Sequence, residues 1–302
     1  MPASIVSSST AANLEYYEQA YRDSTPDGFL YYQREINSIA QTVMGAYFSF
    51  GFRFDRSISI MRKGLYQMLQ EDLETESLRP TALKETNIFE NNIPFRRGLL
   101  TTSERVFFET PFLESGDMEY GQTKIPAMHR YRISVFIWRM LRYLLKDEPF
   151  CRLIQDVMKE KDPITLERLQ ELAEKRYKDS LDWFFDHWFR GSGLPRYEIL
   201  RAEARMVENP RTREIDYKVE IAAANTGEGK MPVPIMVQSE RDWVERPVWL
   251  DSHSSATLSL LMPYRPEYVV IDPDGWIVQE AVWSPERKAR DRPLKKVEIL
   301  DD

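Results

Sequence analysis

Three histidines are available for metal or acid–base chemistry in this sequence, and they are widely separated. His129, His187 and His253 do not lie within four residues of one another. A hydrolytic zinc site on a helix uses two histidines one turn apart, so that both imidazoles converge on the ion, together with a glutamate as general base. No such pair occurs, and no Ser/His/Asp grouping, phosphate loop or Cys/His cluster stands out. The residues alone therefore predict no zinc site.

The element around which the rest of the chain is expected to pack is a buried helix at 131–145. Its apolar residues recur every three or four positions, as on a helix buried over most of its surface. Asp147, Glu148 and Pro149 suit the first turn of the next helix. Further helices are expected at 11–21, 29–48, 55–73, 149–160, 165–178 and 181–190. The stretch 79–122 predicts loops with one short helix near 103–109.

The periodicity changes after the segment 191–195. From there, short runs with a period of two and strand-type composition alternate with turn signals. The chain thus predicts an α+β protein of two domains: helices in 1–195 and an antiparallel β-sandwich in 196–283. The remainder, 284–302, is charged and poor in apolar residues, so we expect a solvated tail.

Composition narrows the classes of partner. The net charge of −7 argues against nucleic acid as a binding partner. The apolar helix at 131–145 is interrupted by three arginines and has 15 residues, too few to span a bilayer. No signal peptide is visible, which favours a soluble, cytoplasmic protein. The single cysteine, Cys151, lies on the apolar side of a predicted helix and is expected to be a small buried residue.

Two motifs resemble the gluzincin aminopeptidases, the family typified by membrane alanyl aminopeptidase (aminopeptidase N). The run YRISVFIWRMLRYLLKDEPF at 131–150 is similar to that family's Tyr-x-x-Gly helix, and LDWFFDHWFRGSGLP at 181–195 is similar to its exit from the helical domain. The later runs at 225–237 and 268–278 resemble its β-sandwich. The resemblance implies a thermolysin-like helical subdomain followed by a sandwich.

The same resemblance locates where zinc ligands should fall. The run NSIAQTVMG at 37–45 matches the family's His-Glu-x-x-His motif, with Asn37 and Gln41 at the ligand positions and Ser38 at the base position. Lys63 falls at the position where the family has its third zinc ligand, a glutamate. Amides are poor zinc ligands, and an ammonium repels the cation. The family's zinc is therefore expected to be absent, with no other cofactor implied.

Tyr131 is the one catalytic-type residue that persists. In the family, the tyrosine at this place donates a hydrogen bond to the oxyanion formed during hydrolysis. A tyrosine at the start of a buried helix is more often an amphipathic core residue, and an oxyanion donor without an activated nucleophile cannot hydrolyse a peptide. We therefore expect Tyr131 to be vestigial.

These observations favour a non-catalytic aminopeptidase-like module with a structural or protein-interaction role. One alternative is a fragment or subunit of a zinc metallo-aminopeptidase whose ligands lie elsewhere. Another is a peptide-binding module that uses the remnant cleft. The expected partner is another protein, or the β-domain that precedes the catalytic helices in the family and is missing here; peptides are the alternative ligand.

Overall fold

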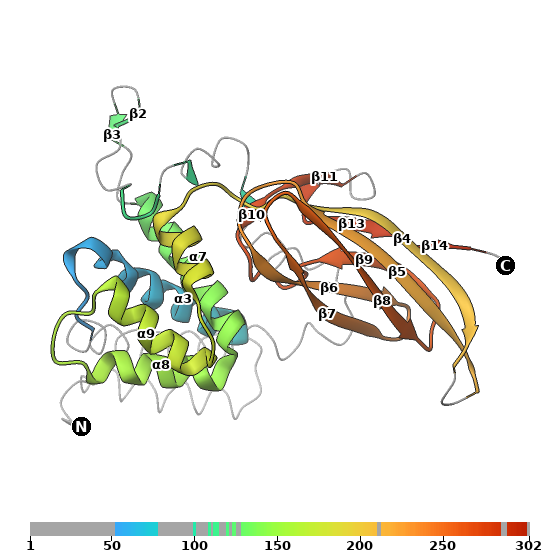
Figure 1. Cartoon of the computed structure of the whole chain (residues 1–302), viewed down its shortest axis with the longest axis horizontal. Helices are drawn as coiled ribbons and strands as arrows, with labels where there is room; N and C mark the ends of the chain where they lie inside the picture. The colour runs from blue at the N-terminus through green and yellow to red at the C-terminus, as the bar shows by residue number, and fades with distance from the viewer. Residues whose placement is uncertain are drawn as a thin grey trace, which may run out of the picture.

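The computed structural model describes most of the chain after the N-terminal region. The described residues are 52–77, 99–100, 108–109, 111–114, 119–120, 123–124, 128–209, 213–284 and 289–300. Within this part, the helices gather at one end of the molecule and the longer strands at the other (Figure 1). The described part is a mixed α+β structure with two four-stranded β-sheets, as the change of periodicity near residue 191 predicts.

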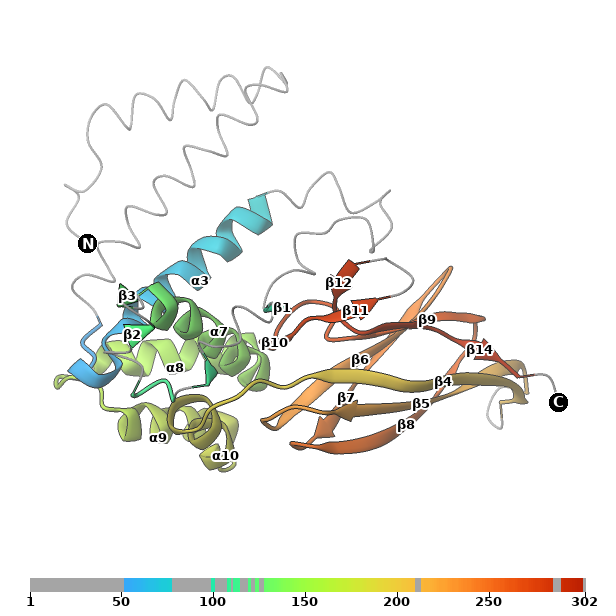
Figure 2. The same ribbon diagram turned by 90° about the horizontal axis from the view of Figure 1, so that it is seen from above.

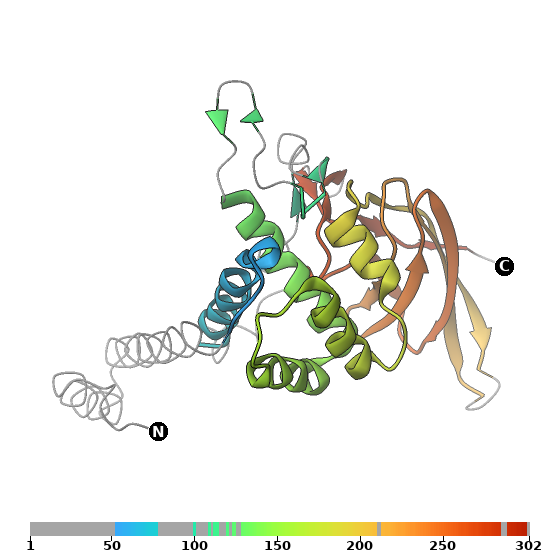
Figure 3. The same ribbon diagram turned by 60° about the vertical axis from the view of Figure 1, so that its left-hand side comes forward.

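The helical part is built around two long helices that pack against each other. Its helices are η1 (Arg56–Ile58), α3 (Ile60–Ser77), α7 (Met128–Leu145), α8 (Asp147–Lys159), α9 (Leu166–Tyr177), α10 (Asp182–Phe185) and the π-helix η4 (Asp186–Arg190). α3 lies alongside α7, blue beside green in Figure 3. The described residues of α7 are almost all buried, so the prediction of a core helix at this place is confirmed.

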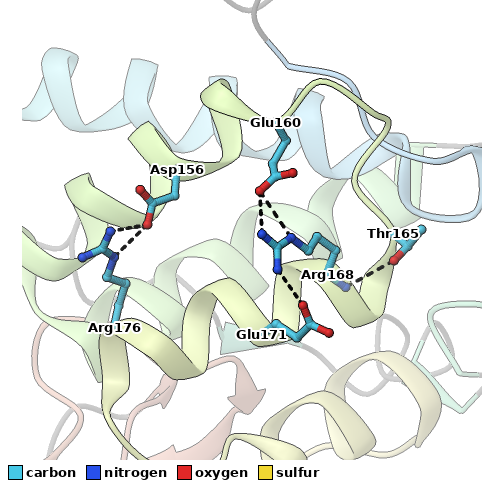
Figure 4. A network of polar contacts seen from close by, with 6 residues as sticks. All are labelled: Asp156, Glu160, Thr165, Arg168, Glu171 and Arg176. Carbon is cyan, nitrogen blue, oxygen red and sulfur yellow. Dashed lines mark hydrogen bonds and ion pairs between the residues drawn. The ribbon is translucent and has the colours of Figure 1, made fainter.

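Charged side chains join α8 to α9 on the outside of the helical part (Figure 4). Arg176 of α9 forms a two-nitrogen contact with Asp156 of α8. Arg168 bonds both Glu160, at the end of α8, and Glu171 in its own helix. These pairs are partly exposed, so each contributes little to stability, and buried leucines between the helices contribute most of it.

Thr165 caps the N-terminus of α9. Its hydroxyl accepts a hydrogen bond from the backbone N–H of Arg168 at 3.2 Å, the arrangement expected of an N-cap residue. The predicted start of this helix is therefore confirmed.

Two four-stranded sheets face each other in the second part of the chain. The strands are β4 (Tyr197–Glu208), β5 (Ile215–Asn225), β6 (Met231–Ser239), β7 (Trp243–Leu250), β8 (Ser254–Met262), β9 (Pro266–Ile271), β13 (Leu294–Lys296) and β14 (Glu298–Ile299). One sheet has the order β13-β9-β6-β7 and the other β14-β4-β5-β8. Figure 2 shows the two sheets as layers. Val219, Ile221, Val237 and Val269 are fully buried between them, because alternate residues of each strand point inward.

Short strands complete the described structure. They are β1 (Leu99–Leu100), β2 (Glu119–Tyr120), β3 (Thr123–Lys124), β10 (Gln279–Glu280), β11 (Val282–Ser284) and β12 (Ala289–Asp291). β1 pairs in parallel with β10, so a segment that precedes α7 is hydrogen-bonded to one that follows β9.

The expectation of a solvated tail is wrong for the described residues after 288. β13 pairs with β9 in one sheet, and β14 pairs in parallel with β4 in the other. Arg292 is 1% exposed. Charge and low hydrophobicity predicted solvation, but a short edge strand needs few apolar residues, and a buried arginine is tolerated where a carboxylate meets it.

The aromatic residues at the exit from the helical part form a buried packing cluster, whereas the expectation for Cys151 is wrong. Phe184, Phe185 and Phe189 are fully buried, and the rings of Phe185 and Phe189 stack with centroids 5.2 Å apart. Cys151 is exposed, because its neighbour Phe150 occupies the inward side of α8 and successive helical residues point about 100° apart.

None of the described helices combines the length and apolar character that a bilayer crossing requires.

Candidate functional site

The crossing of α3 and α7 is where the resemblance places candidate site residues, and a buried hydrogen bond fixes it. Trp138 on α7 donates its indole N–H to the carbonyl oxygen of Met61 on α3 at 2.8 Å. Both side chains are fully buried. A buried indole N–H almost always finds an acceptor, so this bond sets the register of the two helices.

One turn further along, the two backbones come very close. A Cβ atom placed on Gly64 would lie 2.7 Å from the Cβ of Ser134 and 2.8 Å from its carbonyl carbon. Met61 meets Trp138 and Gly64 meets Ser134, so the helices run antiparallel. Glycine is required at residue 64 because any side chain there would push α7 away.

The structure puts two of the predicted site positions on these two helices. Tyr131 precedes Ser134 by three residues, which is about one turn of α7, although its side chain lies outside the described part. Lys63 precedes Gly64 on α3, and its side chain is exposed. Asn37, Ser38 and Gln41 lie outside the described residues. The roles that the resemblance assigns to Asn37, Ser38 and Gln41 therefore stay predictions.

The donor set in the described part of this region does not fit a zinc ion. Lys63 offers a cation where a carboxylate is needed, and Ser134 offers a neutral hydroxyl. Across the described residues, no group of three His, Cys, Asp or Glu side chains is arranged to hold a metal.

A second polar centre joins the helical part to the sandwich. The sequence did not predict that its residues lie together. Asp272 is fully buried and forms an ion pair with Arg292. It also accepts the backbone N–H groups of Trp276 and Ile277 at 2.9 and 3.0 Å. Burial raises the pKa of the Asp272 carboxyl to about 6, although Arg292 and the two N–H groups act in the opposite direction.

Aromatic rings connect this centre to α7. The ring of Tyr143 on α7 stacks on Trp276, with centroids 6.0 Å apart and planes 27° apart. The ammonium of Lys146 lies 4.4 Å from the centroid of the Tyr143 ring. Burial is the main reason that the pKa of the Tyr143 phenol is raised above 10. The stacked rings of Tyr143 and Trp276 therefore connect α7 to the turn that follows β9.

The turn Asp272–Trp276 was visible in the sequence as Asp-Pro-Asp-Gly-Trp, but its partner was not. Asp272 has a φ of 51° and Gly275 a φ of 74°, so the turn needs residues that tolerate the left-handed region. Arg292 lies twenty residues later in the charged segment, where nothing in the local pattern marks it as buried.

A third group of polar side chains lies where the helical part leads into β4. His187 of η4 is largely buried, and its Nε2 atom has no hydrogen-bond partner among the described residues. Burial lowers the pKa of His187, while the nearby carboxylate of Glu228 raises it to a smaller extent. Glu228 bonds Ser252 at 2.8 Å and His253 at 3.0 Å. Because Glu228 and His253 are exposed, these four side chains do not form an enclosed catalytic site.

No protein-family model matches the chain, and no curated protein matches it. Among solved structures, the chain is similar to the crystal structure of Legionella pneumophila aminopeptidase A in complex with aspartic acid, with a TM-score of 0.48 and 16% sequence identity. The match covers 84% of this chain and 28% of that chain.

Proposed function

We propose that this chain is an aminopeptidase-like module that does not cleave peptides by itself and acts through contact with another protein. The observation that carries the proposal is the presence of a lysine, Lys63, at a matched zinc-ligand position. The motif resemblance assigns to this position the carboxylate that completes a zinc site, and here it bears an exposed ammonium. The sequence also lacks any pair of histidines within four residues.

The chemistry supports this conclusion. Peptide hydrolysis by this class of site needs a metal that lowers the pKa of a bound water, and a base that accepts its proton. At the matched base position, Ser38 has no ionisable carboxylate that could accept a proton at neutral pH. Tyr131 could stabilise an oxyanion, but it supplies no nucleophile.

Metal content and peptidase activity together test the proposal. We expect elemental analysis of the purified, zinc-dialysed protein to find no stoichiometric zinc. We also expect no chelator-sensitive hydrolysis of alanine p-nitroanilide. One tightly bound zinc per chain with chelator-sensitive cleavage would overturn the proposal.

A gain-of-ligand variant provides the matched control. Asn37→His, Ser38→Glu, Gln41→His and Lys63→Glu together restore the residues that the resemblance assigns to the zinc site. Zinc uptake by this variant but not by the parent would show that the assay detects a site in this fold and that the replaced residues account for its loss.

A further inference from the structure

A surface cleft lies at the end of the sandwich away from the helices. Its volume is 560 Å³. The turn after β6 (240–242), the turn after β8 (263–265) and the start of β9 surround it, together with residues of β13 and β14. In Figures 1 and 2, β14 lies at this far end. The cleft is therefore separate from both the α3–α7 crossing and the centre around Asp272.

The pairing of the strands shows which side chains lie on the sheet face that borders the cleft. Tyr268 on β9 lies opposite Lys296 on β13 and opposite Gln238 on β6. Residues directly opposite one another on neighbouring strands point to the same face. Lys296 and Tyr268 therefore share one face of the sheet, beside the two turns.

Three cations line the cleft, and they differ from most cations of the sandwich in lacking a carboxylate partner among the described residues. Among the described residues, no carboxylate lies within ion-pair distance of Arg241, Arg265 or Lys296. Elsewhere in the sandwich, four other cations do have such partners: Arg201 pairs with Glu203, Arg213 with Glu208, Lys218 with Glu220, and Lys230 with Asp251. The charges at the cleft are thus available for an external anion.

An aromatic ring holds one of these cations in place. The guanidinium carbon of Arg241 lies 5.4 Å from the centroid of the Tyr264 ring. This cation–π contact orients the guanidinium without neutralising it, so its N–H groups can still grip a carboxylate in a two-point contact. Tyr264 remains 39% exposed and offers an apolar surface beside the charge.

Two carboxylates in the lining narrow the ligand class. Glu240 and Glu267 border the same cleft. They oppose a dense anion such as a phosphate cluster but can accept the backbone N–H groups of a peptide. The volume falls within the range of about 300–1,000 Å³ that is typical of ligand sites.

We propose that this cleft binds an extended peptide segment with acidic side chains, supplied by a partner protein. The acidic side chains meet Arg241, Arg265 and Lys296, and the peptide backbone lies over Tyr264 and Tyr268. This inference rests on the proposed function, in which the chain acts through contact with another protein, and it identifies the cleft as the surface that makes this contact.

Fluorescence anisotropy with a fluorescein-labelled Glu-Ala repeat peptide tests the assignment, with the matching Gln-Ala peptide as a probe of charge. We expect saturable binding of the Glu-Ala peptide only. The double variant Arg241→Gln/Arg265→Gln should weaken it about tenfold or more. Because both side chains are exposed, the melting temperature of this variant should match that of the parent.

The control removes the same charge from cations outside the cleft. Arg201→Gln/Arg213→Gln changes two exposed arginines that already have carboxylate partners. We expect this control to bind like the parent. The inference is overturned if the Glu-Ala peptide shows no saturable binding, if the Gln-Ala peptide binds equally well, or if both double variants lose affinity equally. None of these results affects the zinc and peptidase measurements, so the two proposals fail separately.

Discussion

Gly64 and Ser134 bring α3 and α7 so close together that no side chain fits at residue 64. A Cβ atom there would lie 2.8 Å from the backbone carbonyl carbon of Ser134, and backbone cannot rotate away as a flexible side chain can. This contact and the hydrogen bond from Trp138 to Met61 lie one turn apart and fix the same helix pair.

Gly64→Ala should therefore destabilise the protein, although alanine is the better helix former. Overpacking of this kind costs about 1–3 kcal/mol, more than the helix propensity returns. Urea unfolding followed by tryptophan fluorescence measures the change in the free energy of unfolding. A second change, Ser134→Gly, removes the Cβ and the hydroxyl and should recover part of the loss. A single variant as stable as the parent would contradict the close approach.

Trp138→Phe should also destabilise the helical part. The substitution removes the buried hydrogen bond from the indole N–H to the carbonyl of Met61 and leaves a gap where the larger indole ring packed, at a cost of about 1–3 kcal/mol. Trp283→Phe is the matched control, because Trp283 is 60% exposed and its replacement should change stability by less than about 0.5 kcal/mol. Equal effects of the two changes in urea unfolding would argue against the buried bond.

Arg292→Met should cost about 3–5 kcal/mol, because it leaves the buried carboxylate of Asp272 without its counter-ion. Lys296→Gln changes an exposed cation in the same segment and should have little effect on stability. Thermal and urea unfolding of both variants would check this. If Arg292→Met were as mild as Lys296→Gln, residue 292 would not be the buried partner of Asp272.

His187 should make stability depend on pH below neutrality. Burial lowers its pKa from the ordinary value of 6.5, so below that pH the unfolded chain binds a proton more readily than the folded chain. Its contribution is complete above pH 6.5 and is lost as the pH falls toward the lower pKa of the folded state. The variant His187→Gln should lose less stability than the parent between about pH 7.5 and about pH 5.5. Identical losses in urea unfolding at the two pH values would contradict this role.

Local patterns predicted the elements that are regular and well buried. The spacing of Ile137, Leu141 and Leu144 predicted α7, and the alternation after residue 195 predicted β4 to β9. The failures concern long-range pairing. Nothing near Arg292 indicates that Asp272 lies beside it, and nothing near Lys296 indicates that it lies opposite Tyr268 on the neighbouring strand.

The candidate site was predicted only in part, for the same reason. The resemblance identified Tyr131 and Lys63, and the structure puts them on neighbouring helices. The cleft around Arg241 and Tyr264 could not be predicted, because its residues come from two turns and from the three strands β9, β13 and β14, whose proximity depends on the folded sandwich.

The placement of β13 and β14 also constrains how this protein can fold during synthesis. Residues 294–296 complete one sheet and residues 298–299 complete the other, so neither sheet has all its strands while this segment is still inside the ribosome. The described helices use only residues before 191 and can pack earlier, since domains generally fold as units from the N-terminus. Until the segment emerges, β4 and β9 each present an unpaired edge, which is open to incorrect pairing with another nascent chain.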